Sequence, residues 1–279
     1  MEKQTITVVI PAKNEEKNIQ RCLESVNWCD RVVVISFGTD KTAEIAAKLG
    51  ARVIEKEKNE KDDFKAVQTA INECIDNCQT DWMLRIDADE VVTPELKNEI
   101  ENVLKFKSFK SSHVQTLEPS NIETFVAYGI PRQQFFWGDF LKGGDWAYDR
   151  LVRFFKPKYC RYEPITSIHE QFKVNGNVGY LKNSLLHYSH PTLKIAVDKF
   201  NAYTSLEIND IKDPVWKAVL KMFFLPPYIF LRWMIWHLGL RDGIRGFVAG
   251  IMRSWYEFIL YAKYVEKFIN NKSQITNKH

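Results

Sequence analysis

The sequence predicts an α/β fold, with a mostly parallel sheet covered by helices on both faces. Short apolar runs alternate with helical segments through the first hundred residues, which is the pattern of strand–helix–strand units. The chain has 279 residues, of which 45% are apolar and 27% charged, so it is long and apolar enough to bury a large core. Ligands of such sheets bind beyond the carboxyl ends of the strands, so a functional site is expected there.

The individual elements of the first hundred residues follow from local signals. Pro11 is expected to end the first strand, Gly50 is well placed to cap the end of a helix, and Pro94 suits a first helical turn. Strands are expected at 5–10, 31–35, 51–54 and 82–86, and helices at 15–26, 40–49, 64–78 and from residue 94.

The second half of the chain has fewer signals. The Ser- and Lys-rich segment 105–121 is expected to be a loop, and Pro226-Pro227 is expected to break a helix. Strands are expected at 124–136, 149–155 and 176–187, and helices at 191–209 and through 216–268.

Charge and cysteine content exclude several classes of protein. The 39 Lys and Arg against 35 Asp and Glu give a net charge of +4, too small to indicate a nucleic-acid-binding protein. The five cysteines form no close pair and are expected to be reduced thiols of a cytosolic protein. The N-terminal segment is not expected to be a signal peptide, and no uncharged apolar stretch of about 18 residues predicts a spanning helix.

Two carboxylates follow the fourth expected strand, in Arg85-Ile86-Asp87-Ala88-Asp89-Glu90. In an extended segment, Asp87 and Asp89 would point to the same side and repel each other unless a cation lies between them. Oxygen ligands in an open site suit Mg²⁺ or Mn²⁺, which can neutralise a departing diphosphate. The alternative is an acidic turn that caps the helix beginning at Pro94.

A glycine-containing turn, 36–42, follows the second expected strand and reads SFGTDKT. Its backbone N–H groups and Asp40 could contact an anionic ligand, whereas Asp40 or Thr39 could equally cap the following helix. The turn is not a GxxxxGK[ST] phosphate loop, and no GxGxxG follows a strand, which counts against a dinucleotide fold.

The order of these motifs resembles the family 2 glycosyltransferases. VVIPAKNE at 8–15, SFGTDKT and DADE carry the resemblance, which extends to GGDW at 143–146, RLVRF at 150–154, IHE at 168–170 and HY at 187–188. This set is similar to the branch that includes lipopolysaccharide-core β-1,4-glucosyltransferases.

The resemblance implies a GT-A fold, a nucleotide-diphosphate sugar donor (a UDP-sugar is expected) and inversion at the anomeric carbon. By position, Pro11, Ala12 and Glu15 would line the nucleotide pocket. Asp87 would approach the ribose or the metal ion, and Asp89 would bind the metal ion and the diphosphate.

Three positions depart from the family pattern. Ile35 stands where the family usually has an acidic residue that holds the nucleotide. Gly38 and Gln68 also replace residues that are common in the branch, which are Ser and Asn. These departures leave open a transferase-like protein with weak activity.

Inverting transfer needs one general base within hydrogen-bond reach of the acceptor hydroxyl. Glu170, next to His169, is the first candidate, although the pair could be a surface feature. The fallback candidates are Asp145 and Asp149.

Aromatic and basic side chains suggest further contacts. Arg150 and Arg153 could bind phosphates, or could pair with the acidic cluster. Trp137 and Trp146 could stack on sugars, or could pack in a core.

The region from Trp216 to Lys267 mixes aromatic, aliphatic and basic residues and has few acids. Such helices suit the interface of a membrane with anionic lipids. A helical hairpin on the catalytic domain, or a dimer contact, is the alternative.

These observations predict a metal-dependent transferase in two parts. Residues 1–212 would form the catalytic domain, with nucleotide-binding (about 1–104) and acceptor-binding (about 122–190) parts, and 213–279 would associate with the membrane. We expect a cytoplasmic enzyme, peripheral on the inner face of the plasma membrane, that uses a nucleotide sugar and a glycan or lipid-linked acceptor and no nucleic acid. The alternatives are a glycan-binding scaffold and a phosphotransfer enzyme with Asp87 as nucleophile.

Overall fold

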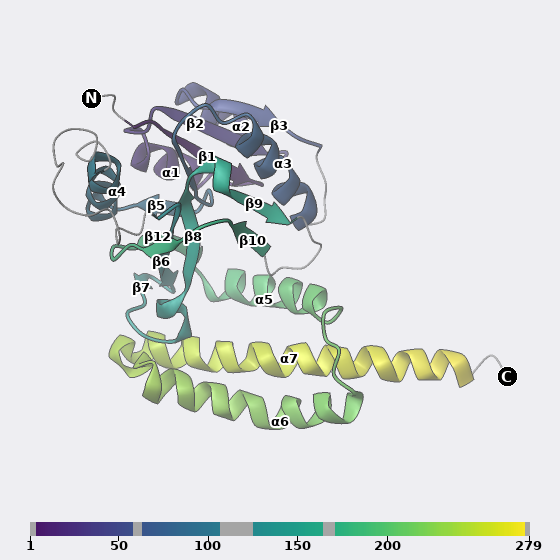
Figure 1. The fold of residues 1–279 in the computed structure, drawn as a ribbon. Helices are drawn as coiled ribbons and strands as arrows, with labels where there is room; N and C mark the ends of the chain where they lie inside the picture. The colour runs from purple at the N-terminus through teal and green to yellow at the C-terminus, as the bar shows by residue number, and fades with distance from the viewer. Residues whose placement is uncertain (1–3, 58–62, 107–124, 164–170, 277–279) are drawn as a thin grey trace. The chain divides into compact units, whose positions relative to one another are not determined.

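The computed structural model describes residues 4–57, 63–106, 125–163 and 171–276. The chain forms two compact units. Unit 1 contains residues 1–132 and 149–187, and unit 2 contains residues 133–148 and 188–279. The predicted boundary near residue 212 therefore lies inside unit 2. Figure 1 shows the elements of both units.

Unit 1 is built on a sheet whose first four strands are parallel, in the order β3-β2-β1-β4, followed by the antiparallel strands β8 and β6. A short antiparallel pair joins β5 to β12, and another joins β9 to β10. The strands are β1 (Ile6–Ala12), β2 (Arg31–Ser36), β3 (Arg52–Glu55), β4 (Trp82–Arg85), β5 (Glu90–Val92), β6 (Ala127–Phe136), β8 (Arg150–Phe155), β9 (Cys160–Glu163), β10 (Gln171–Val174), β11 (Val178–Tyr180) and β12 (Leu185–His190).

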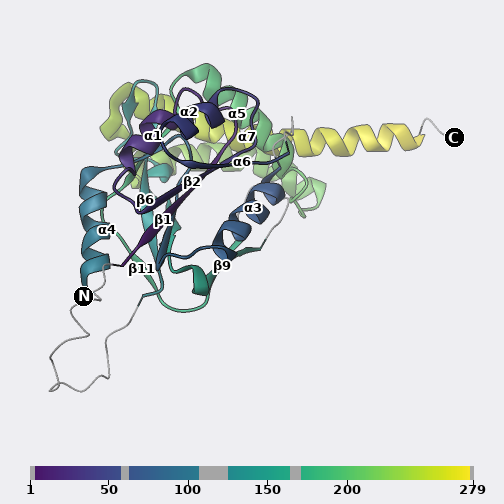
Figure 2. The same cartoon turned by 90° about the horizontal axis from the view of Figure 1, so that it is seen from above.

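Helices cover both faces of this sheet, so the predicted α/β fold is confirmed. Alternate residues of β1 enter different cores: Val8 and Ile10 pack with α1 and α2, and Val9 packs with α3. Figure 2 shows α1 and α2 on one side of β1 and β2, and α3 on the other. The helices are α1 (Ile19–Ser25), α2 (Thr42–Lys48), α3 (Phe64–Asp76) and α4 (Pro94–Phe106).

Unit 2 is mainly helical and has a core of its own. The indole of Trp233 is fully buried in this core and donates a hydrogen bond to the carbonyl of Gly246. The elements are β7 (Asp139–Phe140), which pairs with the end of β6, the short helix η2 (Asp145–Tyr148), α5 (Leu193–Glu207), α6 (Val215–Leu231), the π-helical turn η4 (Arg232–Trp236), the 3₁₀ turn η5 (Gly239–Asp242) and α7 (Gly243–Thr276).

Three local predictions are wrong. Pro11 lies inside β1, which is possible because the pairing with β4 has already ended at Val9 and no N–H donor is needed on that side. The expected strand 176–187 is interrupted between β11 and β12. Helix α6 continues through Pro226-Pro227, because proline fits helical φ and packing against α7 offsets the lost hydrogen bonds.

Other predictions are confirmed. Gly50 follows α2 with a φ of +85°, as expected of a glycine that ends a helix, and Pro94 is the first residue of α4. The expected loop at 105–121 falls mostly outside the described residues.

Candidate functional site

The turns after β1 and β2 are bonded to each other at the carboxyl edge of the sheet. The Asn14 side chain accepts a hydrogen bond from the Thr39 N–H (2.9 Å), and the Thr42 hydroxyl accepts one from the Glu15 N–H (2.8 Å). The turns approach so closely at Gly38 that an added Cβ would lie 2.5 Å from the Asn14 nitrogen. Glycine is therefore required at this position.

Asp40 joins the two turns through its carboxylate. One oxygen accepts from the N–H (3.0 Å) and hydroxyl (2.5 Å) of Thr42, and the other accepts from the Glu16 N–H (3.0 Å). Burial opposes ionisation, but these hydrogen bonds outweigh it and lower the pKa of Asp40. The N-cap residue of α2 is Lys41, so Asp40 is not the cap, although its carboxylate does accept from the first N–H of the helix, that of Thr42. Both oxygens of Asp40 have partners within the protein.

The other residues predicted at the nucleotide pocket surround the end of β1. Pro11 and Ala12 are its last two residues, and the Glu15 carboxylate accepts from the Asn18 side chain (2.7 Å) in the turn toward α1. Ile35 lies opposite Pro11 in β2, but its side chain is completely buried in the core beside α3. The position where the resemblance expects an acid therefore contributes packing and no polar contact.

Asp87 and Asp89 lie in a tight turn between β4 and β5. The Glu90 N–H donates to the Asp87 carbonyl (2.9 Å), which closes the turn. The expectation of an extended segment is therefore wrong, because residues 87–90 form a turn that leads into β5. The two carboxylates contact different partners.

Arginines hold the Asp87 carboxylate. One Asp87 oxygen lies 3.1 Å from the Arg85 guanidinium, and the other accepts from Arg153 at 2.9 Å. Both arginines are almost completely buried, whereas the Asp87 side chain keeps 28% of its surface exposed. Arg153 therefore pairs with the acidic cluster, which was one of its two predicted roles, and its partner is Asp87.

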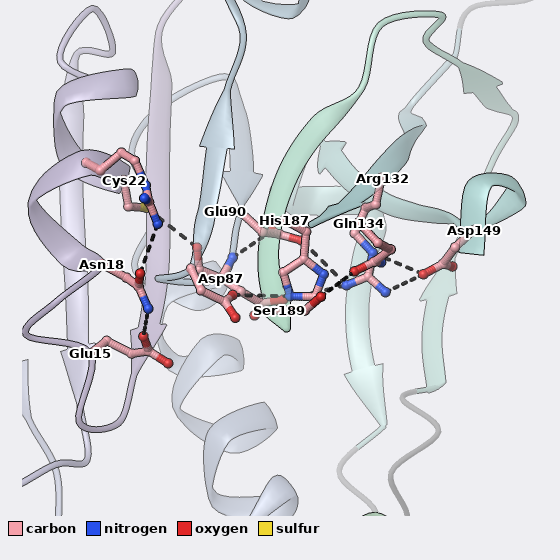
Figure 3. Close-up of polar contacts among 12 residues, drawn as sticks. Glu15, Asn18, Cys22, Asp87, Glu90, Arg132, Gln134, Asp149, His187 and Ser189 are labelled. Atoms are coloured by element: carbon pink, nitrogen blue, oxygen red, sulfur yellow. Dashed lines mark hydrogen bonds and ion pairs between the residues drawn. The ribbon is translucent and has the colours of Figure 1, made fainter. Parts of the chain in front are cut away.

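Glu90 stabilises the Asp87–Glu90 turn through its side chain. Its side chain is fully buried, and one carboxylate oxygen accepts from the Asp87 N–H (2.8 Å). The other oxygen lies 3.5 Å from Arg132, which also binds Asp149 (Figure 3). Burial and the neighbouring Asp87 raise the pKa of Glu90 to about 7.

Asp89 faces His187, a residue of β12. The carboxylate oxygen and the imidazole Nε2 are 3.3 Å apart, and both side chains are largely buried. Burial lowers the pKa of His187, but the Asp89 carboxylate outweighs burial, and the net pKa is raised. Asp89 and His187 therefore form an oxygen–nitrogen pair at the end of the Asp87–Glu90 turn.

This pair can supply part of a metal site. Among the described residues, no three His, Cys, Asp or Glu side chains gather to hold a metal ion. A cation of this type can nevertheless bind through one or two protein ligands, with water and substrate phosphates completing its coordination. Asp89 and His187 fit that arrangement, and the nitrogen ligand favours Mn²⁺ over the harder Mg²⁺. Asp87 fits it less well, because arginines already contact both of its oxygens.

The remaining predicted site residues are distributed over both units. Glu170 and His169 lie outside the described residues. Arg150 is exposed, and its guanidinium lies 5.8 Å from the ring centre of Tyr180. Trp146 packs in the core of unit 2, stacked on His190, as the packing alternative expected. Trp137 remains 41% exposed.

Sequence reasoning gave no role to Arg85, Arg132, Glu90 or His187. A signal for the first was present, because an arginine inside a buried apolar strand needs an acidic partner, and Asp87 is two residues away. Glu90 lies 42 residues from Arg132, and Asp89 lies even farther from His187, so no local pattern identifies these two pairs.

Comparisons with known proteins find similar glycosyltransferases. Residues 7–116 match the model of glycosyl transferase family 2. An uncharacterised glycosyltransferase of Rickettsia typhi is 28% identical over 98% of this chain and 90% of its own length. The lipopolysaccharide core biosynthesis glycosyltransferase LpsC of Rhizobium meliloti is 24% identical over 94% of this chain and 92% of its own length. A solved structure of S. aureus TarS 1–349 in complex with UDP-GlcNAc covers 96% of this chain, with a TM-score of 0.45 and 11% identity.

The resemblance to family 2 glycosyltransferases is thus confirmed. The matched segment contains the turns after β1, β2 and β4, which carry Glu15, Asp40 and Asp89.

Proposed function

We propose that the protein is a family 2 glycosyltransferase, which transfers a sugar from a nucleotide-diphosphate sugar to a cell-envelope glycan or a lipid-linked acceptor, with inversion at the anomeric carbon. A UDP-sugar is the expected donor. The relative LpsC, whose name places it in lipopolysaccharide core biosynthesis, supports an acceptor of this class.

One observation carries this proposal. The turns after three neighbouring parallel strands, β2, β1 and β4, meet at one edge of the sheet, where ligands of α/β proteins bind. There the chain presents Asp89 with His187 at one strand end and the bonded turns of Glu15 and Asp40 at the others. A nucleotide beyond β1, with its diphosphate toward Asp89, fits this order of side chains.

The reaction we propose is a single displacement. An acceptor hydroxyl attacks the anomeric carbon as the nucleotide diphosphate leaves, and a general base takes the hydroxyl proton. Glu170, with His169 beside it, remains the first candidate for the base. Arg132 already binds Asp149, and Arg232 and His237 bind Asp145, so these fallback carboxylates are less available.

We further propose that transfer depends on Mn²⁺ or Mg²⁺. Asp89 would bind the ion together with His187, while Asp87, held by arginines, would contact the ribose or the ion through its exposed edge. When bound, the ion would neutralise charge on the departing diphosphate. Arg150, exposed at the start of β8, is a further candidate for contact with the diphosphate.

The location that we propose is the cytoplasm, at the inner face of the plasma membrane. A donor made in the cytoplasm and an acceptor carried by a lipid meet at that surface. The Val215–Trp236 segment is consistent with this location, since its 22 residues are on average apolar enough, and long enough, to cross a bilayer, by length and composition alone.

The test is sugar transfer by the purified full-length chain. A panel of nucleotide sugars with Mn²⁺ is offered together with envelope glycolipid extracts, and transfer to the extract is measured. We expect one donor to be used, and we expect Asp89→Ala to abolish its turnover without unfolding the protein. Equal turnover by wild type and variant would reject the proposed role of Asp89.

A transferase-like scaffold that binds a glycan without turnover is the second candidate. The buried, apolar Ile35 favours it, because an acid that typically holds the nucleotide is missing there. The same panel separates the two functions, since a scaffold would leave every donor intact while binding the glycan acceptor.

A further inference from the structure

Helix α6 has an apolar face that is exposed along its whole length. Large side chains on this face recur at helical spacing and form what we call the α6 stripe. The α6 stripe consists of Trp216, Leu220, Phe223, Phe224, Tyr228 and Leu231, and Ile235 and Trp236 of η4 continue it.

The opposite face of α6 packs inside unit 2. Ala218 and Ile229 are buried there, and α6 runs beside α7 over its length (Figure 1). On the α6 stripe, by contrast, Phe223 and Phe224 expose 60% and 71% of their surfaces. Only 22% of the most apolar window of Val215–Trp236 is buried within the structure. A continuous exposed apolar stripe of this size indicates a surface that a membrane or another molecule covers.

We propose that the α6 stripe lies in the surface of an anionic lipid bilayer, parallel to the membrane plane, and holds the enzyme on one leaflet. The inference rests on the proposed function, whose acceptor would be carried by a lipid, and it names the surface that brings the enzyme to that acceptor.

Composition favours an anionic bilayer as the occupant. Residues 214–241 contain four basic residues, no acidic residue and one histidine. Lys217 and Lys221, at the start of α6, share Asp213 as their ion-pair partner, so positive charge remains in excess there, and the exposed Arg241 lies in η5. Arg232, which follows the end of α6, is paired with Asp145. Tryptophan, tyrosine and basic residues beside aliphatic ones are the composition of segments that lie among anionic headgroups.

Packing against α7 selects an in-plane helix over a spanning one. A spanning α6 would have to leave α7 or take α7 into the bilayer with it. Leaving would remove Trp233 and Met234 from the core of unit 2. Helix α7 carries charges along its length, including the Arg253–Glu257 ion pair, and such groups are costly in hydrocarbon. An in-plane helix avoids both costs.

The test is flotation of the full-length chain with vesicles that contain neither donor nor acceptor. We expect flotation with phosphatidylcholine vesicles that contain phosphatidylglycerol, and binding weaker by on the order of tenfold to phosphatidylcholine alone. Phe223→Ser/Phe224→Ser should reduce binding by about tenfold or more, because both side chains would leave the lipid. Both are exposed, so the fold should be retained, as circular dichroism would show.

A matched control is Ile195→Ser/Val197→Ser on α5, which also alters two exposed apolar side chains of unit 2. The control should float like wild type. Equal flotation of wild type and the Phe223/Phe224 variant, or equal loss in the control, would overturn the proposal. The proposal would also be overturned if the wild type formed a dimer in lipid-free buffer and the Phe223/Phe224 variant were a monomer, because a second copy would then cover the α6 stripe.

Alkaline carbonate treatment of cell membranes distinguishes the two membrane modes. An in-plane helix should be released from the membranes, whereas retention in the pellet would indicate a spanning helix and overturn the proposal. Flotation needs no sugar transfer, and transfer can be measured in detergent with a soluble acceptor. A failure of the proposed membrane binding is therefore distinguishable from a failure of the proposed sugar transfer.

Discussion

At the scale of single residues, the two aspartates of the Asp87–Glu90 turn have different tasks. Asp87 is a partner of buried arginines, and its backbone is fixed by Glu90. Asp89 contacts His187 and is the better candidate for a metal ligand. A motif that reads as two equivalent carboxylates is therefore asymmetric in the fold.

This asymmetry predicts different stabilities for two matched variants. Asp87→Asn removes a charge that buried Arg85 and Arg153 require, so we expect it to lower the free energy of unfolding by about 3 kcal/mol. Asp89→Asn should cost less, about 1–2 kcal/mol, because the amide that replaces the carboxylate can still hydrogen-bond to the His187 imidazole. Urea unfolding of both variants measures the difference, and equal losses would contradict the separate roles.

Asp40 gives a prediction about pH. Because its pKa is lowered in the folded state, its stabilisation is fully present above its unfolded pKa of about 3.9 and is lost as pH falls through the lower folded value. At neutral pH, Asp40→Asn should cost about 1 kcal/mol, because the Thr42 and Glu16 hydrogen bonds weaken.

Thermal unfolding of wild type and Asp40→Asn from pH 7 down to pH 3 measures this effect. The difference between them should be constant down to about pH 5 and shrink below it. A difference that grows in acid would show that the carboxylate is not the stabilised form.

At the scale of elements, the β1 and β2 turns act as one structure because Gly38 lets them touch. Gly38→Ala would place a methyl group 2.5 Å from the Asn14 nitrogen and force the turns apart. We expect a loss of about 1–3 kcal/mol in stability and weaker donor binding, because Glu15 and Asp40 belong to these turns.

Gly50→Asn is the control for this variant. Gly50 also lies beside α2, and an added Cβ there would meet no atom within 4 Å. Asparagine tolerates its positive φ, so stability should change little. If donor binding fell equally in both variants, the contact between the two turns would not be what positions the site.

The elements also show why some predictions succeeded. The helices and parallel strands of the first hundred residues follow from local apolar spacing, Gly50 and Pro94, and all appear within a few residues of their expected bounds. The continuity of α6 through Pro226-Pro227 was not predictable locally, because packing against α7 outweighs the helix-breaking tendency of proline.

At the scale of the whole molecule, contacts between distant segments complete the candidate site. His187 and Arg132 reach the Asp87–Glu90 turn from β12 and β6, about 97 and 42 residues away from Glu90 along the chain, a separation that no spacing rule covers. The sequence could therefore indicate which strand ends bear the site, and only the fold could supply the partners that make Asp87 and Asp89 different.

The parallel sheet and the residues that make up unit 2 show the same difference between local and distant contacts. The parallel sheet was predictable because each of its strands is apolar and short. Which segments form unit 2 was not predictable. Residues 133–148 and 188–279 share one core through side chains such as Phe136 and Trp233, which lie far apart in the sequence.

The central claim is that the full-length protein binds a sugar nucleotide through a divalent cation at Asp89. Calorimetric titration of UDP into the protein, with Mn²⁺ and with the ion chelated, tests it most directly, using wild type, Asp89→Asn and the exposed control Asp139→Asn. The account predicts Mn²⁺-dependent binding to wild type and to the control, and its loss in Asp89→Asn. Binding that is unchanged by chelation, or that is equal in Asp89→Asn, would contradict it.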